Sequence, residues 1–281
     1  MSRKTKIWLI IAACLVLVGG LIFAGVMTML NWNFTNLSTS KYETNTYEIT
    51  ESFTDILLST TTAHIEFLPS ETEKASVICK EHTNERHAVS VIDGVLRAEV
   101  NSTKKWYEYI GINFGSPKIT VYLPQNEYNS LIVKGSTGNV ELCEKLTFKN
   151  IDVGINTGDI LIKNVSAESI AITVSTGKTT LSDVNCKTLT STGGTGSLYL
   201  KNTIASERFA LKRSTGDINL DKCDAADIVI TCSTGDVKGS LLSEKVFVAN
   251  ADTGKVDVPK TISGGKCEIT TSTGDIKIWV E

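Results

Sequence analysis

"KRSTGDINL", at residues 212–220, is one of eight closely similar segments in the second half of the chain. Each segment contains a Thr-Gly pair that is followed by alternating apolar residues. Successive glycines of these pairs are 19 or 20 residues apart, at Gly138, Gly158, Gly177, Gly196, Gly216, Gly235, Gly254 and Gly274. A fixed period of this length in a β-rich chain is typical of repeats that stack as successive coils.

The apolar residues of the repeats occupy fixed positions relative to the glycine. The second and fourth positions after it are apolar in seven of the eight repeats. This period of two predicts strands that turn the same face inward on every coil, and the glycine supplies the positive φ of a corner. We therefore expect an all-β fold, a parallel β-solenoid (β-helix) of about 19–20-residue coils with two or three short strands per coil. A ninth pair, Thr192-Gly193, is out of register and is treated as coincidence.

A degenerate coil is expected upstream of the regular repeats. Residues 56–67 align with residues 131–142 if Ala63 takes the place of the glycine. The stretch between these coils does not repeat and is predicted to form hairpins, one of them with a turn at Asp93-Gly94. The sequence thus predicts four segments: a cytoplasmic stub and transmembrane anchor at 1–30, a juxtamembrane linker at 31–50, an irregular β region with the degenerate coil and a hairpin insertion at 51–130, and regular repeats at 131–281.

The N-terminus predicts a membrane anchor. Residues 7–30 are uncharged and mostly apolar, and as a helix they would span about 36 Å, enough to cross a hydrocarbon core of about 30 Å. Arg3, Lys4 and Lys6 precede this run and are expected to stay in the cytoplasm. A cleaved signal peptide is the alternative, but its apolar core would be shorter and would end in a small-residue cleavage site. We therefore expect a single-pass protein of the cell membrane whose residues 31–281 are extracytoplasmic.

Charge and cysteine content narrow the class of partner. Outside residues 1–30 the chain has 25 basic and 31 acidic residues, a net charge of −6, which argues against nucleic acid as a partner. Six cysteines lie outside the apolar run, with no C-x-x-C pair and no histidine at metal-ligand spacing. An exported protein could pair them, but their scattered positions in the repeat favour buried free thiols.

Several segments together resemble a known family. They are the N-terminal anchor, "YETNTYEI", "FLPS", "GSPKITVYLP" and the "STGDI" corners. Over roughly residues 40–281 the chain resembles the putative-adhesin family of bacterial envelope proteins, a domain of unknown function built from β-strand repeats. The resemblance implies a role at the cell envelope. The family has no defined catalytic residues, so the resemblance implies none here.

The residue after each glycine is the strongest candidate for chemistry. Aspartate favours such a turn, which explains the four aspartates in this column. Alternatively, Asp217 and Asp236 on adjacent coils could bind Ca²⁺ and cleave an acidic polysaccharide, although Lys178 and Lys255 interrupt the column. The three histidines, His64, His82 and His87, are expected at the surface. No catalytic, cofactor or metal site is therefore predicted.

An aromatic loop is the predicted ligand contact. Trp106, Tyr107 and Tyr109, with Phe114 nearby, could stack on sugar rings, since aromatic side chains offer flat apolar faces with polar tips. The alternative is that this loop covers one end of the core.

The end of the chain suggests self-association. The last repeat is followed only by "DIKIWVE", so its strand edge could pair end to end with another chain.

The function predicted from the sequence is a membrane-anchored, non-catalytic module for binding, adhesion or envelope sensing, whose partner is a cell-wall polymer or an envelope protein. The alternatives are a polysaccharide-acting enzyme on the same scaffold and a self-assembling scaffold similar to bactofilins.

Overall fold

The computed structural model describes residues 2–34, 41–103 and 115–281, apart from the side chain at position 144, and the chain divides into two compact units. The first unit contains helix α1 (Arg3–Met29), whose first turn is capped by the Ser2 hydroxyl, which accepts a hydrogen bond from the Thr5 N–H at 3.2 Å. The most apolar 18-residue window of α1 has a mean hydropathy of 2.8 and is not buried. By length and composition this helix fits a membrane anchor or a signal sequence.

The second unit is a single 18-stranded sheet. Its strands are β1 (Tyr42–Ile49), β2 (Asp55–Thr62), β3 (His64–Pro69), β4 (Ala75–His82), β5 (Glu85–Ile92), β6 (Val95–Ser102), β7 (Lys118–Leu123), β8 (Glu127–Thr137), β9 (Val140–Thr157), β10 (Ile160–Thr176), β11 (Thr179–Thr195), β12 (Leu198–Thr215), β13 (Ile218–Thr234), β14 (Val237–Leu241), β15 (Lys245–Thr253), β16 (Val256–Asp257), β17 (Gly265–Thr273) and β18 (Ile276–Val280).

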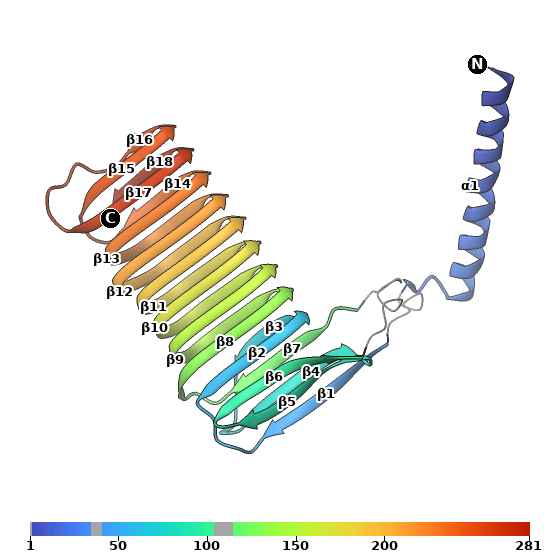
Figure 1. Cartoon of the computed structure of the whole chain (residues 1–281), viewed down its shortest axis with the longest axis horizontal. Coiled ribbons are helices and arrows are strands. Elements are labelled where there is room, and N and C mark those ends of the chain that lie inside the picture. The colour runs from blue at the N-terminus through green and yellow to red at the C-terminus, as the bar shows by residue number, and fades with distance from the viewer. Residues whose placement is uncertain (1, 35–40, 104–114) are drawn as a thin grey trace. The chain divides into compact units, whose positions relative to one another are not determined.

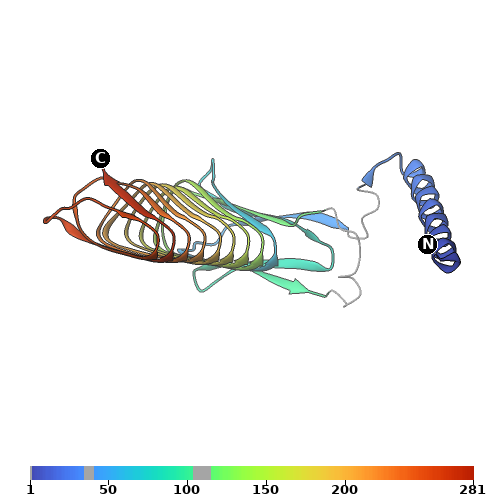
Figure 2. The same cartoon turned by 90° about the horizontal axis from the view of Figure 1, so that it is seen from above.

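Successive repeats from β9 to β13 pair in parallel along their length. Ile160 of β10 is paired with Val140 of β9 on one side and with Thr179 of β11 on the other, so the register equals the repeat period. The degenerate coil at β2 and β3 pairs directly with β8 and β9. Figure 2 shows the turns of the chain in this unit nested one behind another.

The expected fold class, a parallel β-solenoid with two or three short strands per coil, is wrong. Strands β9 to β13 each run continuously for 17 or 18 residues, from just after one glycine to just before the next. The sheet is also mixed, because β4, β5, β6 and β7 make antiparallel pairs. The supported description is an all-β chain with one N-terminal apolar helix, in which one continuous mixed sheet surrounds the core.

The last repeats do not stack in the order of the sequence. Strand β17 lies between β13 and β15, and β18 lies between β14 and β16 (Figure 1). Backbone hydrogen bonds join the inserted strand to its two neighbours. Gly235 N–H donates to the Thr273 carbonyl and Gly274 N–H donates to the Thr253 carbonyl, both at 2.9 Å. The edge expected at "DIKIWVE" is covered at Ile276 and Lys277, which pair with Val256 and Asp257 of β16, and β15 with β16 ends the stack.

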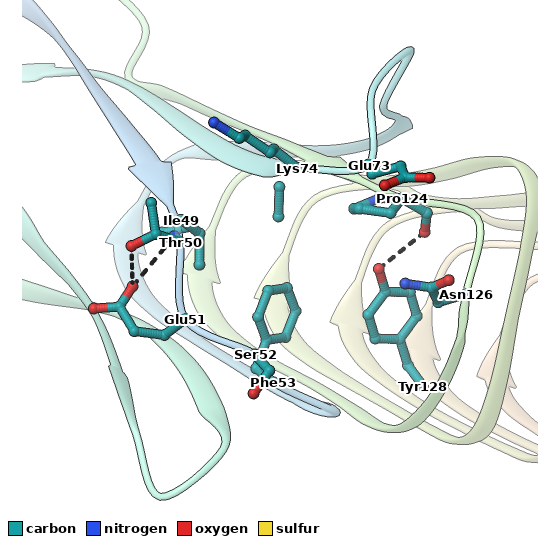
Figure 3. Close-up of a pocket in the computed structure, with 11 residues that line it drawn as sticks. Ile49, Thr50, Glu51, Ser52, Phe53, Glu73, Lys74, Pro124, Asn126 and Tyr128 are labelled. Carbon is teal, nitrogen blue, oxygen red and sulfur yellow. Dashed lines mark hydrogen bonds between the residues drawn. The ribbon is translucent and has the colours of Figure 1, made fainter.

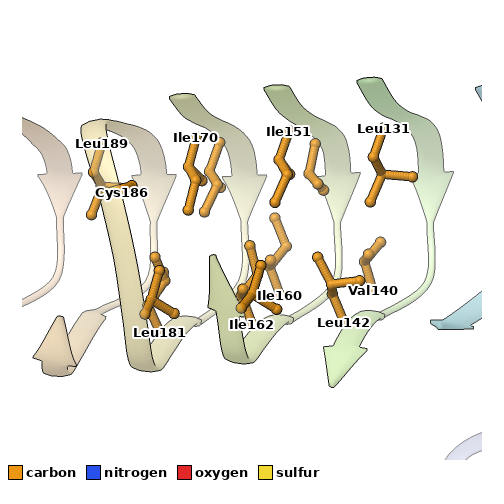
Figure 4. Close-up of a cluster of buried hydrophobic side chains, with 14 of the residues drawn as sticks. Leu131, Val140, Leu142, Ile151, Ile160, Ile162, Ile170, Leu181, Cys186 and Leu189 are labelled. Atoms are coloured by element: carbon orange, nitrogen blue, oxygen red, sulfur yellow. The ribbon is translucent and has the colours of Figure 1, made fainter. Parts of the chain in front are cut away.

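The core consists of inward columns that continue from repeat to repeat (Figure 4). One column lies before the glycine corner and contains Leu131, Ile151, Ile170 and Leu189, each at most 1% exposed. Another lies after the corner and contains Leu142, Ile162 and Leu181, each 0% exposed. Burial of one such side chain contributes about 1.5–3 kcal/mol, so each repeat is stable only when its neighbours cover its inward face.

Glycine is required at the corner for two reasons. Gly158 has φ of 144° and Gly177 has φ of 147°, values that residues with a side chain rarely adopt. In addition, a Cβ on Gly158 would overlap the carbonyl oxygen of Gly138 in the adjacent repeat. The corner therefore excludes other residues through both its own conformation and the close approach of its neighbour.

A second corner, which the sequence analysis missed, lies six residues after the glycine in four of the eight repeats. Asn164, Asp183 and Asn202 have φ of 54°, 57° and 44° there. Asparagine and aspartate tolerate this left-handed conformation better than other residues with side chains. The Asp183 carboxylate also accepts hydrogen bonds from the Asn202 amide at 2.9 Å and the Ser182 hydroxyl at 2.8 Å, which lowers the pKa of Asp183.

The out-of-register Thr192-Gly193 pair has a structural role. Gly193 lies opposite Arg213 of the next repeat, and the Arg213 side chain is 0% exposed. The guanidinium donates hydrogen bonds to the Ser191 carbonyl at 3.2 Å and to the Ser191 hydroxyl at 3.0 Å, and burial lowers the pKa of Arg213 to about 10. A Cβ on Gly193 would lie 2.7 Å from Arg213 Nε, so the glycine provides the space for the arginine.

We predict that Gly193→Ala destabilises the protein by about 1–3 kcal/mol, because the added methyl group displaces a buried side chain. Urea unfolding of the full chain in detergent measures the effect. Gly154→Ala is the matched control, since Gly154 also lies in a strand and a Cβ there meets no atom within 4 Å. Equal stability of the two variants would show that Arg213 does not require the absence of a side chain at position 193.

Candidate functional site

A surface groove on the regular repeats crosses β10, β11, β12 and β13. Its volume is about 570 Å³. We call it the Tyr199 groove, and it is lined by Leu161, Lys163, Lys178, Thr180, Ser182, Tyr199, Leu200, Lys201, Asn219, Leu220 and Asp221.

The repeat builds this groove from its outward residues. Because the second and fourth residues after each glycine point into the core, the third and fifth point outward. The parallel register aligns the third residues of four repeats in one column, Leu161, Thr180, Tyr199 and Asn219. It aligns the fifth residues in another, Lys163, Ser182, Lys201 and Asp221. At about 4.8 Å per strand these columns extend about 14 Å across the sheet.

The groove combines one aromatic ring with several cationic amines. The Tyr199 side chain is 42% exposed and offers an apolar ring face. Lys163, Lys178 and Lys201 surround it, and the Lys201 amine lies 3.6 Å from the Asp221 carboxylate. The groove residues include no cysteine and no histidine that could act as nucleophile or base. This arrangement is suited to binding through stacking, hydrogen bonds and charge.

The carboxylates that follow the glycines stabilise the corners. Asp159 Oδ1 accepts the N–H of Lys178 at 2.7 Å, one repeat further along. In the same way Asp217 Oδ1 accepts the N–H of Asp236 at 2.9 Å, and Asp236 Oδ1 accepts the N–H of Asp275 at 2.7 Å. These hydrogen bonds account for the preference for aspartate in this column. The alternative of a Ca²⁺ or catalytic site at Asp217 and Asp236 therefore has no support from the geometry.

Asp236 has a second partner that affects its titration. The Lys238 amine donates to Asp236 Oδ2 at 2.6 Å, and this contact, with the N–H of Asp275, lowers the pKa of Asp236. A lowered pKa in the folded state means that ionised Asp236 stabilises the fold. That contribution is present above the unfolded pKa of about 3.9 and is lost as the pH falls through the lower, folded value.

We predict that Asp236→Asn lowers the free energy of unfolding at pH 7 by about 0.5 kcal/mol, the usual size for an exposed ion pair. The asparagine retains an oxygen that can accept the backbone N–H, so only the charge is lost. Unfolding measured from pH 7 down to pH 2.5 should show the difference from the wild type disappearing below about pH 4. The exposed Asp257→Asn variant is the control, and a pH-independent difference for Asp236→Asn would contradict this assignment.

A second pocket of about 330 Å³ lies near β1, β4 and β8 (Figure 3). The Tyr128 ring forms one wall and stacks on Phe53 with ring centroids 5.8 Å apart. Its hydroxyl donates to the Pro124 carbonyl at 2.9 Å, and burial raises the pKa of Tyr128 to about 12. Figure 3 shows the carboxylates of Glu51 and Glu73 on opposite sides of this pocket. They do not form an acid-base pair across it.

The predicted surface position of the histidines is wrong for two of them. His82 and His87 are only 7% and 4% exposed, because the ends of β4 and β5 turn these side chains inward. His64 is half-buried, with its Nε2 atom 3.7 Å from Glu141 Oε1. The sequence predicted the hairpin at these residues, but alternation alone did not show which side of each strand the rest of the unit covers.

Burial of His87 creates a cluster that the sequence did not indicate. The potential ligand atoms of Cys79, Glu81 and His87 all lie within 4.8 Å of one another. In hindsight, the only signals were the i, i+2 spacing of Cys79 and Glu81 and the position of His87 across a short turn.

Five cysteines are buried in the core and form no disulfide: Cys79, Cys186, Cys223, Cys232 and Cys267. Burial raises the pKa of each of these five, to about 12 for Cys186, so their thiols remain protonated at neutral pH. The expected burial of the cysteines is confirmed for these five, and Cys143 is half-buried.

The predicted ligand contacts Trp106, Tyr107 and Tyr109 lie outside the described residues, as does Phe114. Their role as a sugar-stacking loop or as a cover for the core stays a prediction.

Comparison with known proteins identifies related sequences and folds. A family model described as Toastrack DUF4097 matches residues 53–190 and 169–281. A crystal structure of a putative adhesin from Bacteroides fragilis has a TM-score of 0.60 and 20% identity, covering 85% of this chain and 97% of its own. At this identity the likeness concerns the fold alone.

Two further crystal structures are more distant. A putative adhesin from Parabacteroides merdae has a TM-score of 0.49 and 12% identity, covering 86% of this chain and 98% of its own. A putative lipid binding protein from Parabacteroides distasonis has a TM-score of 0.48 and 17% identity, covering 84% and 97%. No curated protein matches the chain.

Proposed function

This chain belongs to the Toastrack DUF4097 family, and we propose that it acts as a non-catalytic binding module of the cell envelope. Its resemblance to the putative-adhesin family is confirmed by this membership and by the fold shared with the adhesin of Bacteroides fragilis. The observation that carries the proposal is the Tyr199 groove, where four successive repeats present an aromatic ring, hydroxyl groups and lysines on one outward surface.

The ligand that best fits the groove is an extended acidic polysaccharide. A sugar ring can stack on Tyr199, and its hydroxyl groups can bond to Thr180 and Ser182. Lys163 and Lys178 supply compact positive charges for carboxylate or phosphate groups along the polymer. A linear polymer is favoured because the columns continue across the strands at a constant spacing of about 4.8 Å.

The N-terminal helix supports a location at the cell surface. Arg3, Lys4 and Lys6 precede or begin the apolar run of α1, and such a charge bias keeps this end in the cytoplasm. The repeats would then be extracytoplasmic and anchored to the membrane, where they could hold a wall polymer. The polysaccharide-acting enzyme is less well supported, because Asp217 and Asp236 are bonded to the corners.

We predict that the full-length protein in detergent binds acidic polysaccharides such as polygalacturonate and alginate in preference to neutral dextran. Tyr199→Ala should weaken binding about 10-fold, since loss of one stacking contact is worth about 1.4 kcal/mol. Isothermal titration calorimetry measures the affinity. Trp279→Ala is the matched control, because Trp279 is an exposed aromatic residue on β18, beyond the groove.

Double substitution of Lys163 and Lys178 by glutamine should reduce both the affinity and its dependence on salt. The proposal fails if none of the acidic polymers binds, or if Tyr199→Ala and Trp279→Ala have the same effect while the melting temperatures are unchanged.

Self-assembly is a second candidate, favoured by the exposed end of the sheet. Among the described strands β15 pairs only with β17, so one edge of its backbone is available to another chain. Exposed apolar side chains accompany this edge: Val248 is 55% exposed, Val256 44% and Ile262 97%. A second copy of the chain could pair with β15 and cover these residues.

We predict that sedimentation velocity of the full chain in detergent shows larger species as concentration rises, and that Val248→Lys abolishes them. Ile204→Lys, which places the same charge on an exposed aliphatic residue of β12, away from β15, should leave association intact. A monomer at all concentrations would contradict self-assembly and would leave the groove proposal unaffected.

A further inference from the structure

Three metal-ligating side chains converge beneath the hairpin of β4 and β5. Cys79, Glu81 and His87 are 0%, 1% and 4% exposed, and their sulfur, oxygen and nitrogen atoms lie within 4.8 Å of one another. We propose that these three residues bind Zn²⁺. The site lies on β4 and β5, whereas the Tyr199 groove lies on β10 to β13, so this proposal does not rest on the proposed function.

The hairpin itself brings the ligands together. Cys79 and Glu81 are two residues apart on β4, so both side chains point to the same inward face. The chain then turns, with His82 paired to Glu85, and places His87 on the inward face of β5. Strand geometry thus fixes all three side chains without any loop.

The distances require only a small adjustment for a metal ion. His87 Nδ1 lies 2.7 Å from Glu81 Oε2. Zn²⁺ bonds to nitrogen and oxygen at about 2.0–2.2 Å in tetrahedral geometry, which separates two ligand atoms by about 3.3 Å. The two side chains would therefore move apart by roughly 0.6 Å, with the metal taking the place of the proton now between them.

Neighbouring strands already provide the supporting contacts that zinc ligands require. His87 Nε2 lies 3.1 Å from the Thr60 hydroxyl of β2, so with Nδ1 on the metal the Nε2–H donates to this oxygen. The other carboxylate oxygen of Glu81 accepts a hydrogen bond from the Asn45 amide of β1 at 2.8 Å. Such outer contacts hold the ligating imidazole and carboxylate in orientation.

Charge balance favours a divalent ion at this depth. A thiolate and a carboxylate together neutralise Zn²⁺, so the loaded site carries no net charge inside the core. On binding, the Cys79 thiol releases its proton to solvent, and the hydrogen on His87 Nδ1 is replaced, through exchange with solvent, by one on Nε2, so that the imidazole stays neutral. A sulfur and an imidazole ligand favour Zn²⁺ over Ca²⁺ or Mg²⁺, which prefer oxygen ligands alone.

Cobalt substitution tests the site directly. Full-length protein in detergent, reduced and freed of metal by chelator, is titrated with Co²⁺ and then with Zn²⁺. We expect one equivalent of Co²⁺ to bind with a sulfur-to-cobalt charge-transfer band, and Zn²⁺ to displace it and raise the melting temperature. Absence of the band and of any Zn²⁺-dependent melting shift in the wild-type protein would overturn the proposal.

Substitutions of Cys79 and His87 test whether these residues are the metal ligands, and Cys267→Ser is the control. Cys79→Ser should lose the charge-transfer band, whereas Cys267→Ser, which alters an equally buried thiol elsewhere in the core, should keep it. His87→Gln should weaken Zn²⁺ binding at least 10-fold in equilibrium dialysis. Circular dichroism verifies that each variant is folded, and the wild-type titration decides the matter even if Cys79→Ser fails to fold. Retention of the band by folded Cys79→Ser would also overturn the assignment.

Discussion

The structure depends on the backbone hydrogen bonds that join each glycine corner to the corner of its neighbour. Gly138 N–H donates to the Thr157 carbonyl, and Gly158 N–H to the Thr176 carbonyl, both at 2.9 Å. The backbones approach so closely here that a Cβ on either glycine would overlap the adjacent repeat. The corners therefore fix the register, and the register fixes which side chains face each other along the rest of every strand.

One register produces both the core and the candidate binding surface. Because strand side chains alternate, the parallel alignment that stacks Ile162 on Leu181 also stacks Lys163 on Ser182 on the outer face. The first column stabilises the unit by excluding water, and the second becomes part of the Tyr199 groove. A linear polymer suits such a surface, since the columns place side chains at a constant spacing across the strands.

The departures from the repeat show where local chemistry matters. Gly193 has no side chain, and the Arg213 side chain of the next repeat occupies the space that this leaves. A buried guanidinium is thereby accommodated in an apolar column. The hairpin of β4 and β5 interrupts the parallel order, and its inward face gathers Cys79, Glu81 and His87. These features depend on contacts between different strands, and the 19–20-residue repeat of the sequence does not predict such contacts.

The sequence by itself determined the N-terminal apolar helix, the all-β character of the repeats, the glycine corners and the inward columns, because each follows from the local residue pattern. It also aligned Ala63 with the glycines. It did not determine the length of the strands. Only the tertiary structure decided that β17 and β18 insert before β15 and β16, since every repeat has a similar pairing edge and sequence cannot rank them. The same holds for Tyr199 and for His87, whose neighbours on other strands, rather than their own segment, decide whether each lies in a groove or in the core.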